Sequence, residues 1–273
     1  MTMAMNMKNF KQQGLSIIEL MVSTAVGMII LAGVSSVYMS TLTSTSSTLK
    51  ASKLNQELST LMSVMTADIH RAGVWGNANF TTPQTNPFNQ VNTTALEVVY
   101  GIGNDNPIPE ANYVADAGSC IVYTYDANLD GVLDDSDIMG FRLNNGVVEM
   151  RQSGDVVNNA AHISCNNAND TWIPVTDSRL VSVTQLDISL KDSECINTRE
   201  PNGIDDDSDA ATNDDVEMNC YAAGMVPAVG SGNITVETRN IEIALAGELA
   251  TDGTVNVQLN QTVRVRNDLV RIR

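Results

Sequence analysis

Twelve residues, 126 to 137, hold a dense set of oxygen donors at regular intervals. Side-chain oxygens stand at the first, third, fifth, ninth and twelfth positions of this segment, which are Asp126, Asn128, Asp130, Asp134 and Asp137. Gly131 occupies the sixth position, where the backbone must turn sharply, and Val132 offers its carbonyl at the seventh. Oxygen donors at these intervals are the ligands that Ca²⁺ prefers. The segment therefore predicts one calcium site.

This segment resembles the calcium loop of EF-hand proteins position by position. Leu133 supplies the apolar residue usual at the eighth position. Asp137 departs from the pattern, because the family has a Glu there that binds through both oxygens. The shorter side chain predicts weaker binding, which suits the roughly millimolar calcium outside cells. A solvated acidic turn is the alternative, since strand-like rather than helical segments flank the loop.

A second acidic segment, 205–217, lacks this spacing, and we expect a solvated loop whose charges repel one another. The alternative is a second calcium ion held by Asn202, Asp205, Asp207 and Asp209. The only histidines are His70 and His162, which argues against a zinc site. A Ser/His/Asp set and a phosphate-binding glycine loop are also missing from the sequence, so it does not indicate an enzyme.

Four cysteines, Cys120, Cys165, Cys195 and Cys220, predict two disulfides and an oxidising compartment. Three connectivities are possible. We favour Cys120 with Cys165, and Cys195 with Cys220. The second pair would close the loop that carries the second acidic segment and would lower the entropy of that insertion.

A further carboxylate, Glu19, is the only charge in the apolar run 15–38. A run of this length can span a bilayer as a helix, and the preceding Lys8 and Lys11 favour a cytoplasmic N-terminus. A secretory signal peptide is one alternative, but the run is long for that and no A-x-A site follows it at once. A plain anchor is another, but it leaves Glu19 unexplained, since a carboxylate at the edge of a span is costly.

The stretch Gly14-Leu15-Ser16-Ile17-Ile18-Glu19-Leu20-Met21-Val22 resembles the class III signal of type IV prepilins and pseudopilins. The resemblance implies that a prepilin peptidase cuts between Gly14 and Leu15 and that Leu15 is then N-methylated. It also implies that Glu19 serves assembly by pairing with the α-amino group of a neighbouring subunit. That pairing would compensate a poorly solvated carboxylate in a filament core.

The same helix is predicted to continue past the membrane to about Ala72. Apolar residues recur at intervals of three and four and so share one helix face: Leu54, Leu58, Leu61, Met65, Ile69 and Ala72. Polar residues line the other side, at Lys53, Gln56, Glu57, Ser63 and Thr66. Gly73 is the expected stop.

Two further stretches resemble PilW-type minor pilins. They are Asp68-Ile69-His70-Arg71-Ala72-Gly73-Val74-Trp75-Gly76 and the chain end Thr262-Val263-Arg264-Val265-Arg266-Asn267. The resemblance implies an α+β pilin fold, with the long helix packed on an antiparallel sheet that carries long loops. The expected parts are a leader (1–14), a transmembrane and filament-core helix (15–38), an amphipathic helix with its junction (39–76) and a β-rich exported head (77–273).

The head shows β patterns after a loop over 77–92. The predicted strands are 96–100, 120–125, 139–143, 147–151, 180–190, 234–246 and 255–265. Asn144-Asn145-Gly146 predicts a hairpin turn between two of them. We expect one antiparallel sheet and no second long helix.

Charge and resemblance together lead to a functional hypothesis. The net charge of −17 excludes a usual nucleic-acid binder, which needs clustered Lys and Arg. We expect a minor type IV pilin, a non-enzymatic subunit that primes pilus assembly or forms part of the tip and supports motility, adhesion or DNA uptake. Its expected partners are other pilins, the prepilin peptidase, the inner-membrane assembly platform and a large tip adhesin. It would start in the inner membrane and end in the periplasm or the extracellular pilus. The alternatives are a minor pseudopilin of type II secretion and a tip-located adhesive module.

Overall fold

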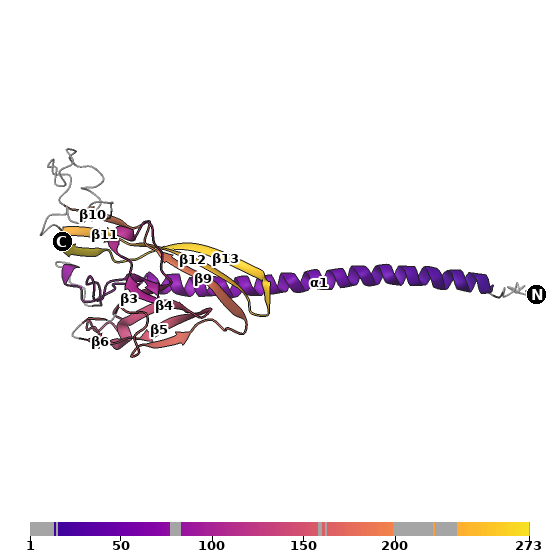
Figure 1. The fold of residues 1–273 in the computed structure, drawn as a ribbon, viewed down its shortest axis with the longest axis horizontal. Helices are drawn as coiled ribbons and strands as arrows, with labels where there is room; N and C mark the ends of the chain where they lie inside the picture. Colours follow the sequence, from indigo (N-terminus) through magenta and orange to yellow (C-terminus); the bar gives the residue numbers. More distant parts are fainter. Residues whose placement is uncertain are drawn as a thin grey trace, which may run out of the picture. The chain divides into compact units, whose positions relative to one another are not determined.

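The computed structural model of the chain describes residues 14, 16–76, 83–157, 160–161, 163–198, 221 and 234–272. Two compact units divide the chain, Met1–Leu49 and Lys50–Arg273. Each unit is described by itself below. The element order is one long helix followed by short strands and three short 3₁₀ turns (Figure 1).

A single α-helix, α1 (Ile17–Ile69), contributes to both units. Its 53 residues contain no proline, so no backbone N–H is lost along its length. A short turn follows it, in which Gly73 has a φ of 73°. This left-handed conformation suits glycine and lets the chain turn away after the helix. The helix itself ends at Ile69, three residues before the predicted end at Ala72.

The head half of α1, which lies in the second unit, buries one face. Leu54, Leu58, Leu61, Met65 and Ile69 are buried, and Ala72 just beyond the helix is buried as well, as their spacing predicts. One residue expected on the polar side is also buried, namely Thr66. Its hydroxyl donates to the Met62 carbonyl at 2.9 Å, so its polar group is satisfied inside the helix.

The second unit contains a six-stranded antiparallel sheet of order β2-β1-β3-β4-β5-β8. Its strands are β1 (Glu97–Gly101), β2 (Asn104–Pro107), β3 (Cys120–Thr124), β4 (Ile138–Asn144), β5 (Val147–Ser153) and β8 (Thr171–Pro174). The predicted hairpin turn joins β4 to β5, with Asn145 and Gly146 both at positive φ. Positive φ at both positions is the geometry that the Asn-Gly pair favours.

A three-stranded antiparallel sheet of order β13-β12-β9 lies beside the head half of α1 (Figure 1). Its strands are β9 (Val181–Ser189), β12 (Asn240–Leu249) and β13 (Asp252–Arg264). Gly247 permits close packing here, because a Cβ at that position would lie 3.3 Å from a Leu58 methyl group. β12 alternates buried and half-buried residues along its whole length, the period of a strand with one covered face.

Smaller elements complete the second unit. A three-stranded sheet has the order β10-β11-β14, with β10 (Glu194–Asn197), β11 (Ile234–Thr238) and β14 (Leu269–Ile272), and β6 (Val156–Val157) pairs with β7 (Ala160–Ala161). The 3₁₀ turns are η1 (Pro83–Thr85), η2 (Glu110–Asn112) and η3 (Asp135–Asp137).

The α+β class is confirmed, and two expectations about the strands are wrong. The predicted strand 234–246 is two strands, because the chain leaves β11 at Arg239 and enters a different sheet as β12. Arg239 is buried and donates to the Leu96 carbonyl at 2.7 Å, which fixes the break. The expected single sheet is likewise divided among several sheets.

Candidate functional site

The segment around the predicted cleavage point begins α1. Gly14 is exposed, and Leu15 lies outside the described residues. The Ser16 hydroxyl accepts from the Ile18 N–H at 3.4 Å, and the Glu19 carboxylate accepts from the Ser16 N–H at 3.1 Å. This arrangement resembles a capping box, except that the hydroxyl accepts from the second helical residue instead of the third, and it satisfies N–H groups that have no partner inside the helix. Sequence reasoning missed it, although the S-x-x-E spacing is its usual signal.

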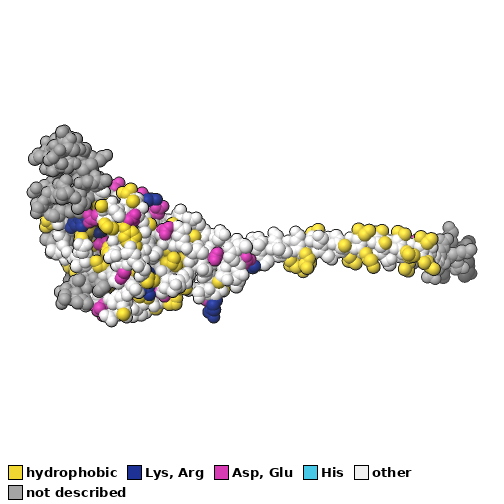
Figure 2. All heavy atoms as spheres, in the orientation of Figure 1, with side chains coloured by type: hydrophobic (Ala, Val, Ile, Leu, Met, Phe, Trp, Pro, Cys, Tyr) yellow, Lys and Arg dark blue, Asp and Glu magenta, His cyan; other side chains and the backbone are white. Residues whose placement is uncertain are grey.

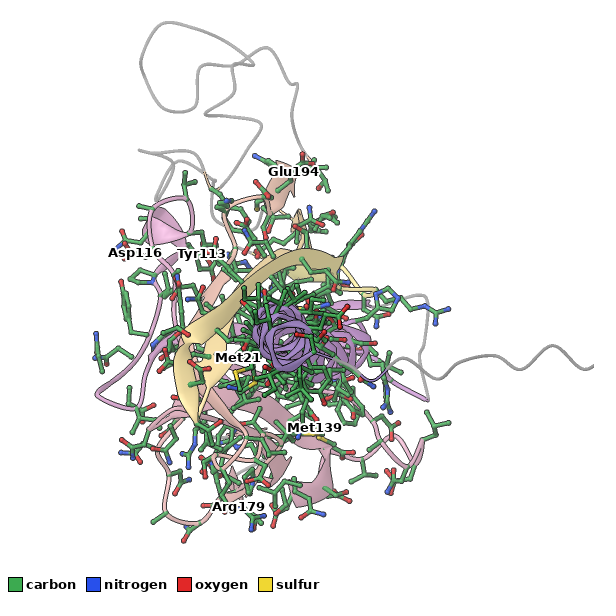
Figure 3. All side chains as sticks on the ribbon, turned by 90° about the vertical axis from the view of Figure 1, so that its right-hand side faces the viewer. Met21, Tyr113, Asp116, Met139, Arg179 and Glu194 are labelled. Atoms are coloured by element: carbon green, nitrogen blue, oxygen red, sulfur yellow. A yellow bond between two sulfur atoms is a disulfide. The ribbon has the colours of Figure 1, made fainter. Side chains whose placement is uncertain are left out.

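The first unit exposes its apolar side chains in all directions. From Ser16 to Lys53 every described side chain is exposed except Gly27. The apolar residues gather along the N-terminal part of the helix, and Met21 is one of them (Figures 2 and 3). This stretch is long and apolar enough to cross a membrane, and none of it is buried within the chain. Such a surface requires a lipid or protein environment.

A hydroxyl-rich stretch follows the apolar one. Thr41, Thr43, Thr45 and Thr48 each donate to a carbonyl four residues earlier, at 2.8 to 2.9 Å. The hydroxyls of these four threonines are thus satisfied by the helix itself. Satisfying a hydroxyl in this way lowers the cost of moving it into a medium of low polarity.

The C-terminal end of α1 is tied to the head by a buried carboxylate. Asp68 accepts from the hydroxyls of Tyr123 and Tyr125 at 2.6 and 2.9 Å. Arg71 lies 4.0 Å from the Tyr125 ring centroid and 3.5 Å from the Asp68 carboxylate. Burial, with the adjacent Asp68 charge second, raises the pKa of both tyrosines, so they remain neutral donors. The stretch 68–76 therefore contains residues that fasten the helix to β3 and to Tyr125 just after it.

The acidic loop 126–137 engages its side-chain oxygens with backbone N–H groups. The Asp126 carboxylate is buried and accepts from Gly76, Asp130 and Gly131. The Asp137 carboxylate is buried and accepts from Ala127 and Asp134. The bond to Gly76 ties this loop to the junction that follows α1. The loop has a structural role of its own, which sequence reasoning did not foresee.

The other predicted calcium ligands are more exposed. Asn128 accepts from the Asp130 N–H at 3.1 Å, Asp130 from the Val132 N–H at 2.8 Å, and Asp134 from the Ser136 N–H at 2.8 Å. Burial raises the pKa of Asp137, and the nearby Asp134 and Asp126 raise it further. Across the described ranges, no three His, Cys, Asp or Glu side chains are gathered as a metal site. The loop thus carries oxygen ligands of the kind that calcium binds. In this structure those oxygens accept hydrogen bonds from the backbone of the loop itself.

Two models of known protein families match the chain. A family model described as prepilin peptidase-dependent protein B matches residues 47–265, and a model of the prokaryotic N-terminal methylation motif matches residues 9–35. The first match covers more than half of the chain. The chain belongs to the prepilin peptidase-dependent protein B family. No curated protein and no solved structure matches it.

In this member of the protein B family, one disulfide lies within the six-stranded sheet region. Cys120 on β3 is bonded to Cys165, with 6.4 Å between their Cα atoms, and both are buried. The Arg142 guanidinium donates to the Cys165 carbonyl, and Asp105 accepts from the Cys165 N–H at 2.6 Å. Cys195 is also disulfide-bonded, while its expected partner Cys220 lies outside the described residues. The second acidic segment and His162 lie outside them too.

This protein B head also buries a group of charges that sequence reasoning missed. Glu237 on β11 accepts from the Tyr221 hydroxyl and pairs with Arg271 on β14, which also pairs with Glu110. Arg239 lies 3.9 Å from Glu237. Burial raises the pKa of the neighbouring Glu97 carboxyl to about 7, and the charges of Glu110 and Glu237 add to the effect of burial, while Arg239 opposes it. The only signal in the sequence was the alternation that turns Glu237 inward.

Proposed function

We propose that the chain is a minor type IV pilin of the PilW type, a structural subunit that helps to initiate pilus assembly or forms part of the pilus tip. The observation that carries the proposal is the first unit, an apolar helix exposed on all sides that begins just after Gly14, within the methylation motif at residues 9–35. Such a helix is stable only in a bilayer or among equivalent helices. The proposal assigns the chain no catalytic activity.

In this proposal the prepilin peptidase cuts after Gly14, and Leu15 becomes the methylated N-terminus. Cleavage leaves Ser16 and Glu19 in the mature chain, so the capping box survives processing. A new α-amino group at Leu15 would lie one residue from this box. Glu19 would then exchange its bond with the Ser16 N–H for an ion pair with a neighbouring subunit's amino group, which adds a charge-assisted bond.

Processing is tested with Gly14→Leu, with Gly27→Leu as the matched control. An added Cβ meets no atom within 4 Å at either glycine, so neither change disturbs contacts made by the chain itself. The mass of the membrane form decides the result. We expect unprocessed Gly14→Leu and normally cut Gly27→Leu, and a cut Gly14→Leu chain contradicts the proposed site.

Assembly is tested separately with Glu19→Val. This variant should be processed and inserted normally, but it should not rescue pilus assembly in a strain that lacks the gene. Pilus counts from that strain also address the alternative, a minor pseudopilin of type II secretion. Loss of secreted enzymes with normal pilus numbers favours the pseudopilin, and loss of pili favours the pilin.

The third possibility is an adhesive module at the tip, in which the head itself contacts a surface. Removing residues 205–215, a segment outside the described part of the chain, separates this role from assembly. Reduced attachment with normal pilus numbers supports direct adhesion. Reduced pilus numbers support the assembly role and leave adhesion to a larger partner.

We also propose that the loop 126–137 binds one Ca²⁺ in the exported head. Its ligands would be side-chain oxygens of Asp126, Asn128, Asp130, Asp134 and Asp137 with the Val132 carbonyl, the oxygen-only donor set that calcium takes. What supports the proposal is that Asp137 already holds the two ends of the loop together through the Ala127 N–H, and that Asp126 accepts from the Gly131 N–H at the central turn. Asp130 and Asp134 would have to turn from backbone N–H groups toward the ion.

The calcium proposal is tested with Asp130→Ala, because Asp126 also holds three backbone groups and its loss would disturb the fold without calcium. Asp192→Ala, at an exposed position outside the loop, is the control. We expect calcium to raise the melting temperature of the native and control chains but not of Asp130→Ala. The proposal is contradicted if millimolar calcium leaves the melting temperature of the native chain unchanged.

A further inference from the structure

The strand β13 forms an unusual outer edge of its sheet. It has thirteen residues, whereas the outer strands of the other multi-stranded sheets, β2, β8, β10 and β14, have four residues each. β2 and β8 also contain a proline. Short strands and prolines are the usual means by which proteins protect sheet edges from unwanted pairing. Within the described strands, β13 is therefore the long edge.

The opposite edge of the same sheet, β9, is covered by neighbouring segments. The Val183 N–H donates to the Gly146 carbonyl at 2.9 Å. Ile188 and Gly118 exchange two backbone hydrogen bonds, at 2.8 and 2.9 Å. One side of the sheet is thus closed by the rest of the head, and the other side ends in β13.

The register identifies which backbone groups of β13 face outward. The Val265 N–H donates to the Arg239 carbonyl, a pair that continues the register of Asn240 with Arg264. In an antiparallel ladder the residues alternate, and each directs its N–H and C=O to the same side. Odd-numbered residues of the regular stretch therefore face β12. The even-numbered residues, Asn256, Gln258, Asn260 and Thr262, direct both groups away from it.

The turn that follows α1 covers this edge only near its C-terminal end. His70 Nδ1 lies 2.7 Å from the Arg264 carbonyl oxygen, and the Arg266 N–H donates to the His70 carbonyl at 3.1 Å. Both contacts use even-numbered residues, as the register requires. From 256 to 262 the outward N–H and C=O groups have no hydrogen-bond partner among the described residues.

The side chains along this edge are uncharged. Residues 253–263 include no Asp, Glu, Lys, Arg or Pro, in a chain whose net charge is −17. Charges stand only at the two ends, where Asp252 pairs with Lys50 and Arg264 with Asp268. The register is irregular only near the hairpin end, between Glu248 and Leu249. The stretch 256–262 therefore has none of the usual protections: no charge, no proline and no bulge.

We propose that this edge, residues 256–262 of β13, is a strand-addition site for an extended, uncharged segment of a different polypeptide. The added segment would become the fourth strand of the sheet. It would pair with the outward N–H and C=O groups of the four even-numbered residues. Charge complementarity selects an uncharged occupant, because a charged segment would meet no counter-charge along the edge and the end charges are already paired.

A second copy of the chain fits this edge less well, an argument that rests on the membrane anchor in the proposed function. β13 runs in the same direction as the head half of α1, since Asp252 pairs with Lys50 and Arg264 meets His70. Antiparallel pairing of two β13 edges would therefore reverse the second copy's α1. Of the two possible pairings, only the parallel one, which is slightly less stable per residue, leaves both copies of the head half of α1 running in the same direction.

The test uses the full chain in detergent micelles and a fluorescein-labelled peptide of ten alternating Thr and Val residues with a Lys at each end. Fluorescence anisotropy should show saturable binding. The same peptide N-methylated at alternate residues should not bind, since it keeps the side chains but loses backbone donors. Gln258→Pro removes one outward N–H without touching the ladder to β12, and a roughly tenfold weaker affinity is expected. Gln258→Ala keeps the N–H and should change the affinity less than about twofold.

Hydrogen exchange on the native chain provides a measurement that does not depend on the variant's folding. The bound peptide should slow exchange at the amides of Asn256, Gln258, Asn260 and Thr262. The proposal is overturned if the peptide does not bind, if the N-methylated peptide binds equally well, or if those four amides exchange at an unchanged rate. A chain that self-associates through β13 and excludes the peptide overturns it as well. Failure here leaves processing at Gly14 untouched, so the two proposals fail independently.

Discussion

The helix α1 is exposed in the first unit and buries one of its faces in the second unit. In Met1–Leu49 the helix exposes nearly every side chain, including Ile17, Met28 and Leu31, whose exposed fractions are 79%, 71% and 66%. In Lys50–Arg273 the same helix buries Leu54, Leu58 and Met65 completely. Both parts are helical, so the difference in burial lies in the partner that covers the apolar side chains. The second unit contains its own partner in β12 and the neighbouring strands, and the first unit must find one outside the chain.

Because of this contrast, the stability of the head and the behaviour of the exposed helix can be measured separately. Both tryptophans, Trp75 and Trp172, lie in the second unit, so their fluorescence reports unfolding of the head alone. Substitutions in the first unit should leave that signal unchanged and affect only membrane insertion or assembly. The four predictions below test this separation in order of decreasing expected effect.

The largest effect is expected from Leu58→Ala. Leu58 is fully buried and lies against Gly247, so truncation leaves a cavity and should lower the free energy of unfolding of the head by about 3 to 4 kcal/mol. Leu31→Ala removes the same atoms from an exposed position of the first unit. Denaturant melts followed by tryptophan fluorescence should show no change for it, and equal losses for both variants would contradict the separation of the units.

A pH-dependent loss of stability is expected from Glu97. Its carboxyl has a pKa of about 7 in the folded head, above the usual 4.5, chiefly because it is buried. Between these values the folded state keeps a proton that the unfolded state releases, so stability falls as pH rises from about 4.5 to about 7.

Melts at a series of pH values should show this fall, roughly 3 kcal/mol in size for a shift from 4.5 to about 7, and Glu97→Gln should remove it. The variant should also be more stable than the native head at pH 8. If the stability of Glu97→Gln still falls over this pH range, another buried acid is responsible for the pH dependence.

A smaller effect is expected where α1 is fastened to the head. Asp68→Asn keeps the shape of the side chain but replaces the carboxylate that accepts hydrogen bonds from the hydroxyls of Tyr123 and Tyr125. Loss of charge-assisted bonding should cost about 1 to 2 kcal/mol in the same melts. Glu57→Gln, at an exposed position on the same half of the helix, is the control. A stable Asp68→Asn head would mean that the two tyrosines are satisfied without the charge.

Prediction from the sequence worked where a feature depends on spacing within one segment. The buried face from Leu54 to Ile69 follows from intervals of three and four, and the turn at Asn145 and Gly146 follows from the need for positive φ. Both signals are local and need no knowledge of the rest of the fold. The class III signal at Gly14 is local in the same sense.

Prediction failed where a residue's partner comes from a distant segment. The strand break at Arg239 depends on the Leu96 carbonyl, 143 residues away, and the buried Glu237 depends on Arg271 and Tyr221. The outward alternation of β13 could be foreseen, but not which side of the strand lacks a neighbour. The bonds that turn the acidic loop toward Gly76 are equally non-local.

The smallest expected effect concerns the capping box that begins α1. Ser16→Ala removes the hydroxyl that accepts from Ile18 but leaves Glu19 in place, and should reduce helix stability by about 1 kcal/mol or less. Because no described residue of the first unit is buried, the loss should show as fraying of the first turn. Hydrogen exchange of the first four amides of α1 in micelles measures it, with Ser23→Ala, inside the same helix, as the control. If Glu19 pairs with a neighbouring amino group in the filament, as proposed, the variant should still assemble. Failure of Ser16→Ala to assemble would mean that the box itself, and not only the Glu19 charge, is needed to present the helix.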